Sequence, residues 1–161
     1  MKNWDARPIE IRNLFNPGFC GLVLFRSLAA YREVDERGMP FSLSLLILPL
    51  CLHRQSRETF QRGNRSYFLR ILAEHPELQV GLGRRCTDVL PFTFEGLGLL
   101  MQLQTLSVHA DGRLLPGSRV RKTIVGTQES VACQRVAAFL GKEFARIGDR
   151  GTIYTTLGVR P

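Results

Sequence analysis

Cysteine and histidine are the residue types of this chain that could supply a catalytic nucleophile or bind a transition metal. Cys51 and His53 lie closest together, but residues two apart on a helix point in different directions, so they predict no thiol–imidazole pair. His75 precedes a helix-ending proline, and His109 lies on an outward-facing strand. The cysteines are tens of residues apart, without a CxxC pair or a histidine at ligand spacing: Cys20, Cys51, Cys86 and Cys133. We therefore expect buried free thiols, no metal site and no cofactor.

Carboxylates and glycines add no catalytic motif. Acid–base catalysis and divalent-metal binding need carboxylates that converge, whereas those of this chain are scattered singly or lie in an exposed turn at Asp35-Glu36. Gly81-Leu82-Gly83 and Gly96-Leu97-Gly98 lie inside helical patterns, while a phosphate loop needs a strand before it and a helix after it. Gly141-Lys142-Glu143 also lies within a continuous helical pattern. The sequence therefore predicts that the protein is not an enzyme and that it works by contact.

A net charge of +8 predicts a positive field that favours phosphate backbones, acidic proteins or anionic lipid. The basic residues form three clusters, in a polar connector at 54–65, at Arg84-Arg85, and after a predicted hairpin at 119–122. Arginine suits bidentate contact with phosphate or carboxylate, although each cluster could equally be solvated surface. The candidate contacts for nucleic acid or an acidic partner are Arg54, Arg57, Arg62, Arg65, Arg84, Arg85, Arg119, Arg121 and Lys122.

The elements that would position these residues predict a mainly α fold, a compact helical domain with a small β-hairpin, over residues 1–161. With 44% hydrophobic residues, a chain of this length can bury a core without disulfides or metals. Asn16 as N-cap and Pro17 in the first turn begin a helix that is apolar nearly all round as far as Ala29. Such a helix belongs in the centre of the domain.

Two further helical segments and a connector follow. Phe41 to Leu52 predicts a buried helix, entered at Pro40 as its first helical position and kinked by Pro49. It is too short to cross a bilayer, which needs about 20 apolar residues. After the connector, Ser66 to Glu74 predicts a short amphipathic helix with Phe68, Leu69 and Leu72 as its apolar stripe.

The next region predicts two helices and a hairpin. Helices are expected at 77–90 and, restarting after Pro91, at 93–103, where the inward residues would be Phe94, Leu97, Leu100 and Met101. Residues 105–109 alternate with period two, Asp111-Gly112 fits a two-residue turn, and Arg113-Leu114-Leu115 forms the return strand. A helix of about ten residues that leads directly into a hairpin is the order of a winged helix, which many unrelated small folds share.

The last third predicts a short strand at 122–125 and a long helix that begins near Thr127 or Ser130 and ends at Gly148. A short helix or turn follows in the tail from Gly151 to Pro161. The expected organisation is an apolar N-terminal arm (1–15), a helical core (16–104), a hairpin or wing region (105–126) and a C-terminal helix with its tail (127–161).

Both ends of the chain carry more apolar surface than a free terminus normally does, which predicts that they pack onto something. The sequence leaves open whether each end packs on its own domain, on a partner or on a second copy. The candidate docking residues are Trp4, Ile9, Ile11, Leu14, Phe15, Tyr154, Leu157 and Arg160.

These ends also carry a family resemblance. The chain begins with Trp4-Asp5-Ala6-Arg7-Pro8, continues with Asn13 to Cys20, and closes with Thr152-Ile153-Tyr154-Thr155-Thr156-Leu157-Gly158-Val159-Arg160-Pro161. With Gly38 to Phe41 and Leu46 to Pro49, these segments resemble the middle component of bacterial three-component ABC systems. Such proteins are encoded between a chromosome-maintenance-type (SMC-like) ABC ATPase and a variable effector. The resemblance implies an adaptor or regulator with these two partners and a role in anti-phage defence, and it supplies no active-site residue.

Two functions follow as expectations. The first is a non-enzymatic adaptor that links the ATPase to the effector. The alternative is a winged-helix DNA-binding protein with residues 93–103 in the major groove and Arg113 on the wing. Because that segment offers only Thr93, Glu95 and Gln102 as polar side chains, DNA contact would be limited to the phosphate backbone. The absence of a basic segment before an apolar run at the N-terminus predicts a cytoplasmic protein without membrane contact. Homo-oligomerisation is left open.

Overall fold

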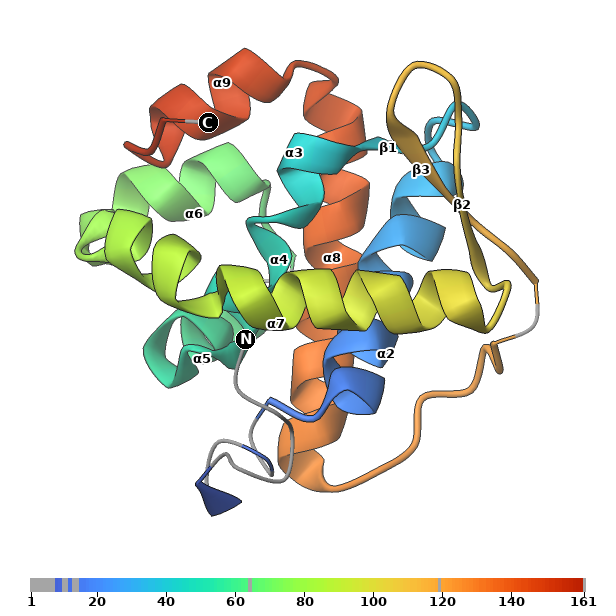
Figure 1. The fold of residues 1–161 in the computed structure, drawn as a ribbon. Coiled ribbons are helices and arrows are strands. Elements are labelled where there is room, and N and C mark those ends of the chain that lie inside the picture. The colour runs from blue at the N-terminus through green and yellow to red at the C-terminus, as the bar shows by residue number, and fades with distance from the viewer. Residues whose placement is uncertain (1–7, 10–11, 13–14, 64, 119, 161) are drawn as a thin grey trace.

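The computed structural model of the chain describes residues 8–9, 12, 15–63, 65–118 and 120–160. Helices surround a central pair, α2 (Pro17–Arg32) and α8 (Gln128–Ile147), and a small three-stranded sheet lies at one side (Figure 1). The prediction of a mainly α fold with a small β-hairpin is confirmed. Most of the N-terminal arm predicted at 1–15 lies outside the described residues.

The two central helices begin where the sequence predicts. The Asn16 side chain accepts the N–H groups of Gly18 and Phe19, at 2.8 and 3.3 Å. The Thr127 hydroxyl accepts the Ser130 N–H at 3.2 Å, and Gly148 ends α8 in the left-handed conformation. These caps satisfy N–H groups that have no partner within the helix.

Glycine lets α2 cross its neighbours at short distance. A Cβ atom on Gly141 of α8 would overlap the Ser27 carbonyl oxygen of α2. On the other side, a Cβ atom on Gly96 of α7 (Leu82–Gln102) would lie 2.9 Å from the backbone nitrogen of Gly21. The three backbones therefore form a closely packed centre.

The prediction of separate helices at 77–90 and 93–103 is wrong, because α7 continues through Pro91 for 21 residues. Residues 76–79 instead form the 3₁₀ helix η2 (Pro76–Gln79). Proline removes one hydrogen bond, but here it lies on the exposed side of the helix, while the apolar face stays packed against α2 and α4. Two residues expected to point inward, Phe94 and Met101, are exposed.

The single kinked helix expected at 41–52 is also wrong. Met39–Pro40 form the strand β1, and two short helices follow, α3 (Phe41–Ser44) and α4 (Ile47–Leu52). Pro40 is thus the N-cap of α3. Pro49 lies in the first turn of α4, where its missing N–H costs no helical hydrogen bond, so the chain breaks at residues 45–46 instead.

The polar connector expected at 54–65 contains a helix, α5 (Arg54–Arg62), which His53 caps by accepting the Ser56 N–H at 3.4 Å. The amphipathic helix α6 (Phe68–Glu74) follows, as predicted at 66–74. Its N-cap residue makes no side-chain cap bond; the Glu143 carboxylate of α8 accepts the Phe68 N–H at 2.8 Å in that place.

The sheet contains β2 (Leu106–Val108) and β3 (Arg113–Pro116), and its antiparallel order is β1-β3-β2. The predicted hairpin is present, but its turn has three residues, because His109 pairs with Arg113 and Gly112 adopts a positive φ of 81°. The strand predicted at 122–125 is absent from the described residues, and β1, which the sequence did not indicate, is the third strand.

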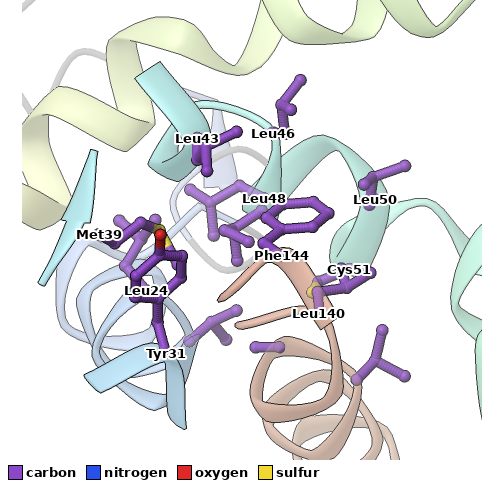
Figure 2. Packing of buried hydrophobic residues seen from close by; sticks show 14 of the residues in the cluster. Leu24, Tyr31, Met39, Leu43, Leu46, Leu48, Leu50, Cys51, Leu140 and Phe144 are labelled. Carbon is purple, nitrogen blue, oxygen red and sulfur yellow. The ribbon is translucent and has the colours of Figure 1, made fainter. Parts of the chain in front are cut away.

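The core lies between α2, α4 and α8. The last helix, α9 (Arg150–Thr156), covers the core at the C-terminal end of α8. Figure 2 shows side chains of α2, α3, α4 and α8 meeting in one cluster, among them Leu24, Leu48 and Phe144. Cys20, Cys51 and Cys133 are buried free thiols as expected, whereas Cys86 is half-buried. Among the described residues, no helix has the length and apolar character needed to cross a bilayer.

Candidate protein-docking groove

The hairpin tip, α3 and α9 lie at the same end of the molecule (Figure 1). Residues from all three line a groove there. Its first half is a cavity of about 590 Å³ between the tip residues 111–113 and the start of α3. Its second half is a cavity of about 530 Å³ along α9 and the tail. The two cavities share Ser42, Asp149 and Arg150, so they form one surface, the docking groove.

Hydrogen bonds to the backbone fix both walls of the docking groove. The Tyr154 hydroxyl of α9 donates to the Ser42 carbonyl oxygen of α3 at 2.7 Å. The Arg113 guanidinium of β3 donates to the Gly38 carbonyl oxygen at 2.7 Å. The segment that carries α3 is thus held at both ends by residues more than 70 positions away in the chain.

The carboxylates in these walls are engaged locally. Asp149 caps α9, and the hydroxyl and N–H that Thr152 donates to it, each at 2.7 Å, lower the pKa of that carboxyl. At the hairpin tip, the Arg113 N–H donates to Asp111 and lowers the pKa of the Asp111 carboxyl. Both groups are therefore ionised at neutral pH and already bonded.

The arginines of the docking groove are more available than its carboxylates. Arg150 and Arg160 are exposed, and no carboxylate lies within salt-bridge distance of either one in the described part of the chain. Arg113, by contrast, lies near Asp111 and Asp35, at 3.4 and 3.7 Å. The guanidinium groups of Arg150 and Arg160 give the second cavity, along α9 and the tail, positive character.

One residue of an exposed aromatic pair, Phe41, lines the first cavity. Phe41 of α3 and Phe94 of α7 stack with ring centroids 6.1 Å apart, and they are 37% and 49% exposed. Aromatic residues are enriched at protein–protein contacts because a large apolar area can be buried with little loss of side-chain freedom. The groove therefore combines an apolar rim with a positive wall.

The side chains most often used for metal binding and thiol catalysis are missing from the described lining of this groove. No thiol or imidazole lines it, and no three His, Cys, Asp or Glu side chains among the described residues are placed to hold a metal ion. Burial raises the pKa of Cys20 to about 12, and burial also raises the pKa values of Cys51 and Cys133, so these thiols are poor nucleophiles. The arrangement is suited to binding.

Several basic residues that the sequence singled out lie close to acidic residues of their own helix. Arg54 and Arg62 both lie near Glu58 on α5, and Arg84 lies 3.7 Å from Asp88 on α7. These exposed pairs at i and i+4 are typical of a solvated helix face.

Two arginines of the set are already bonded within the chain. Arg57 is buried at 5% exposure and donates to the Cys51 and Leu52 carbonyl oxygens and, at 2.6 Å, to Glu129. Arg85 donates to the carbonyl oxygens of residues 78 and 80. Arg65, Arg121 and Lys122 are exposed, and Arg119 lies outside the described residues.

Of the predicted docking residues, Arg160 and Tyr154 line the groove, and Tyr154 also belongs to the core, as Leu157 does. Phe15 stacks on Phe92 of α7 with centroids 4.2 Å apart, so this part of the arm packs on its own domain. Ile9 is 59% exposed. Trp4, Ile11 and Leu14 lie outside the described residues.

Sequence reasoning missed the positioning role of Arg26. Arg26 is only 8% exposed and donates to the Gln134 side chain and to the carbonyl oxygens of Arg121, Lys122 and Thr123, which fixes the segment between β3 and α8. A lone arginine inside an apolar helix was the available signal, because a buried charge needs several hydrogen bonds.

The sequence analysis also did not predict that Asp149 and Arg150 would line a groove. An aspartate directly after a helix-ending glycine, with Thr152 three residues later, is a recognisable helix start. No sequence signal indicated that this start would lie beside Phe41.

The described part of the chain is thus a compact helical body with a groove suited to binding. The chain matches the family model of the ABC-three component (ABC-3C) system Middle Component 3 over residues 4–161, and it belongs to this family. Comparisons with curated proteins and with solved structures gave no match. The protein is thus a middle component of an ABC-3C system.

Proposed function

We propose that the protein is a non-enzymatic adaptor, which links the SMC-like ABC ATPase of an ABC-3C anti-phage system to a variable effector by protein–protein contact. The observation that carries the proposal is the docking groove. Phe41, one residue of an exposed aromatic pair, lines it together with Arg150 and Arg160, and neither arginine has a carboxylate within salt-bridge distance in the described part of the chain. The groove contains binding groups and no catalytic ones among its described residues.

An adaptor needs a second surface, because it must contact two proteins at once. The segment from residue 120 to 127 lies at the opposite end of α8 from the docking groove (Figure 1). Arg26 donates hydrogen bonds to the carbonyl oxygens of Arg121 and Lys122 in this segment. The side chains of Arg121 and Lys122 are exposed. The close crossings of α2 with α7 and α8 give a rigid body between these two ends.

Co-expression of this chain with the ATPase and the effector encoded beside it tests the proposal. A tag on the effector should recover the ATPase only when this chain is present. Recovery of the ATPase in equal amount without this chain would refute the adaptor role. If this chain elutes alone from both partners at low salt, the proposal fails as well.

A phosphate-backbone contact with DNA is the second candidate function. The exposed side chains of Arg65, Arg121 and Lys122 favour it. Base readout is not favoured, because the exposed side of the C-terminal half of α7 presents Phe94, Met101 and Leu103. A gel shift with random duplex at about 50 and 200 mM salt is the test, since backbone contacts weaken steeply over this range. No shift at the lower salt would exclude this function.

A further inference from the structure

We infer that the docking groove binds an acidic, extended segment of a protein partner that carries one aromatic or large apolar anchor residue. This inference rests on the proposed adaptor function and specifies the partner chemistry of one of its two surfaces.

The charge of the groove favours an acidic occupant. Arg150 and Arg160 have no carboxylate partner among the described residues, while Asp149 and Asp111 are already bonded to groups of their own walls. An incoming carboxylate can therefore pair with a free guanidinium without displacing an existing ion pair. Because both arginines line the α9 side, the acidic residues of the segment should lie along that side.

The aromatic rim favours an apolar anchor. Phe41 lines the 590 Å³ cavity and stacks on the exposed ring of Phe94, and the cavity volume is within the range of roughly 300–1,000 Å³ typical of ligand pockets. A third aromatic ring placed against this pair would cover apolar surface that water now contacts. The anchor residue of the segment would lie against Phe41 in the first cavity. The acidic residues would follow along Arg150 and Arg160 in the second cavity.

Other occupants fit less well. A second copy of the chain has the same net charge of +8, so its approach to a positive groove is opposed. A nucleic-acid backbone could pair with the same arginines, but its phosphates and sugars carry no apolar group that would cover the exposed ring of Phe41. An acidic protein segment satisfies both the charge and the apolar rim.

The test uses the full-length protein and an array of short overlapping peptides that covers the co-encoded ATPase and effector. The peptides that bind should be rich in Asp and Glu and should contain an aromatic or large aliphatic residue. The affinity of the best peptide is then measured by fluorescence anisotropy for the wild type, for Arg150→Glu with Arg160→Glu, and for Phe41→Ala. The matched control, Arg65→Glu with Arg135→Glu, changes the net charge equally at exposed arginines outside the groove and outside residues 120–127.

We expect the groove charge reversal to weaken peptide binding by at least about tenfold and the control by less than about twofold, because short-range ion pairs act locally in salt. Phe41→Ala should weaken binding by about tenfold, and Phe94→Ala repeats the test from the other side of the stack if Phe41→Ala unfolds. Equal weakening in both arginine pairs would show that only the overall charge matters, and it would overturn the inference.

The outcomes separate the inference from the proposed function. If wild type and groove variant join the ATPase and effector equally well, the groove is not the contact and the adaptor role stands. If the wild type joins neither protein, the adaptor role fails. A dimer in solution that Phe41→Ala dissociates would identify a second copy as the occupant and would overturn the inference, as would duplex DNA that competes with the bound peptide.

Discussion

The crossing of α2 and α8 makes a strong prediction about two glycines that are otherwise alike. Gly141 and Gly98 both lie in the interior of long helices, where replacing glycine by alanine favours the helix by about 1 kcal/mol. A Cβ atom on Gly98 would meet no heavy atom within 4 Å, so Gly98→Ala should keep the whole gain. For a chain of this size, about 1 kcal/mol raises Tm by roughly 2–4 °C.

Gly141→Ala should act in the opposite direction. The new methyl group would overlap the Ser27 carbonyl oxygen, a backbone atom that cannot rotate away, so α2 and α8 would have to separate. Overpacking costs about 1–3 kcal/mol in well-packed cores, and moving two central helices places this variant at the upper end, for a net loss of about 2 kcal/mol after the helix gain. Gly96→Ala, with a 2.9 Å contact, should fall between the two.

Urea unfolding of the three variants and the wild type measures these differences. The expected order of stability is Gly98→Ala, wild type, Gly96→Ala and Gly141→Ala. If Gly141→Ala unfolds at the same urea concentration as Gly98→Ala, the close crossing of α2 and α8 is wrong, and with it the rigid centre between the two ends of the molecule.

Three further predictions concern polar residues. Glu143→Gln should destabilise α6 by about 1–3 kcal/mol, because a weaker acceptor replaces the carboxylate that binds the Phe68 N–H, and hydrogen exchange of α6 should rise more than that of α2. The pKa of Asp149 is lowered, so its contribution to stability is complete above the ordinary pKa of 3.8 and is lost as pH falls through the lower value of the folded state. Asp149→Asn caps a helix comparably without titrating, so unfolding curves at neutral and acid pH should show a larger acid-dependent loss of stability in the wild type than in this variant. Arg26→Met removes the donors that hold the carbonyl oxygens of residues 121–123, and trypsin should then cut after Arg121 and Lys122 several-fold faster, while an unchanged rate would show that Arg26 does not fix this segment.

Local signals in the sequence were sufficient for the elements that depend on them. Asn16, Thr127 and Gly148 each act through hydrogen bonds or backbone angles within a few residues, and the helices they bound were predicted correctly. Pro91 and Pro49 misled the prediction, because a proline breaks a helix only when packing does not compensate. At Pro91 the apolar face of α7 outweighs one lost hydrogen bond, and at Pro49 no such bond is lost.

The docking groove could not be predicted because it depends on contacts between distant segments. In the sequence, Phe41 and Phe94 have the same apolar character as residues that are fully buried, and only the positions of α3 and α7 expose their rings. The pairing of β1 with β3 sets the position of α3, and a two-residue strand has no readable pattern of its own. Tyr154 and Leu157, which were singled out for docking, are both buried, and Tyr154 also lines the groove.

The geometry of the groove also gives a route by which an occupant could influence the rest of the protein. The segment from Gly38 to Ser42 has its first carbonyl oxygen bonded to Arg113 of the hairpin and its last bonded to Tyr154 of α9. The segment from Gly38 to Ser42 therefore joins the hairpin to α9. A partner segment that contacts both walls would change the distance between the hairpin and α9. Because α9 follows α8 directly and the hairpin leads into residues 120–127, both walls connect along the chain to the segment that Arg26 holds at the far end. A middle component that binds one partner in the groove and another at residues 120–127 would thus have a continuous physical connection between its two contacts.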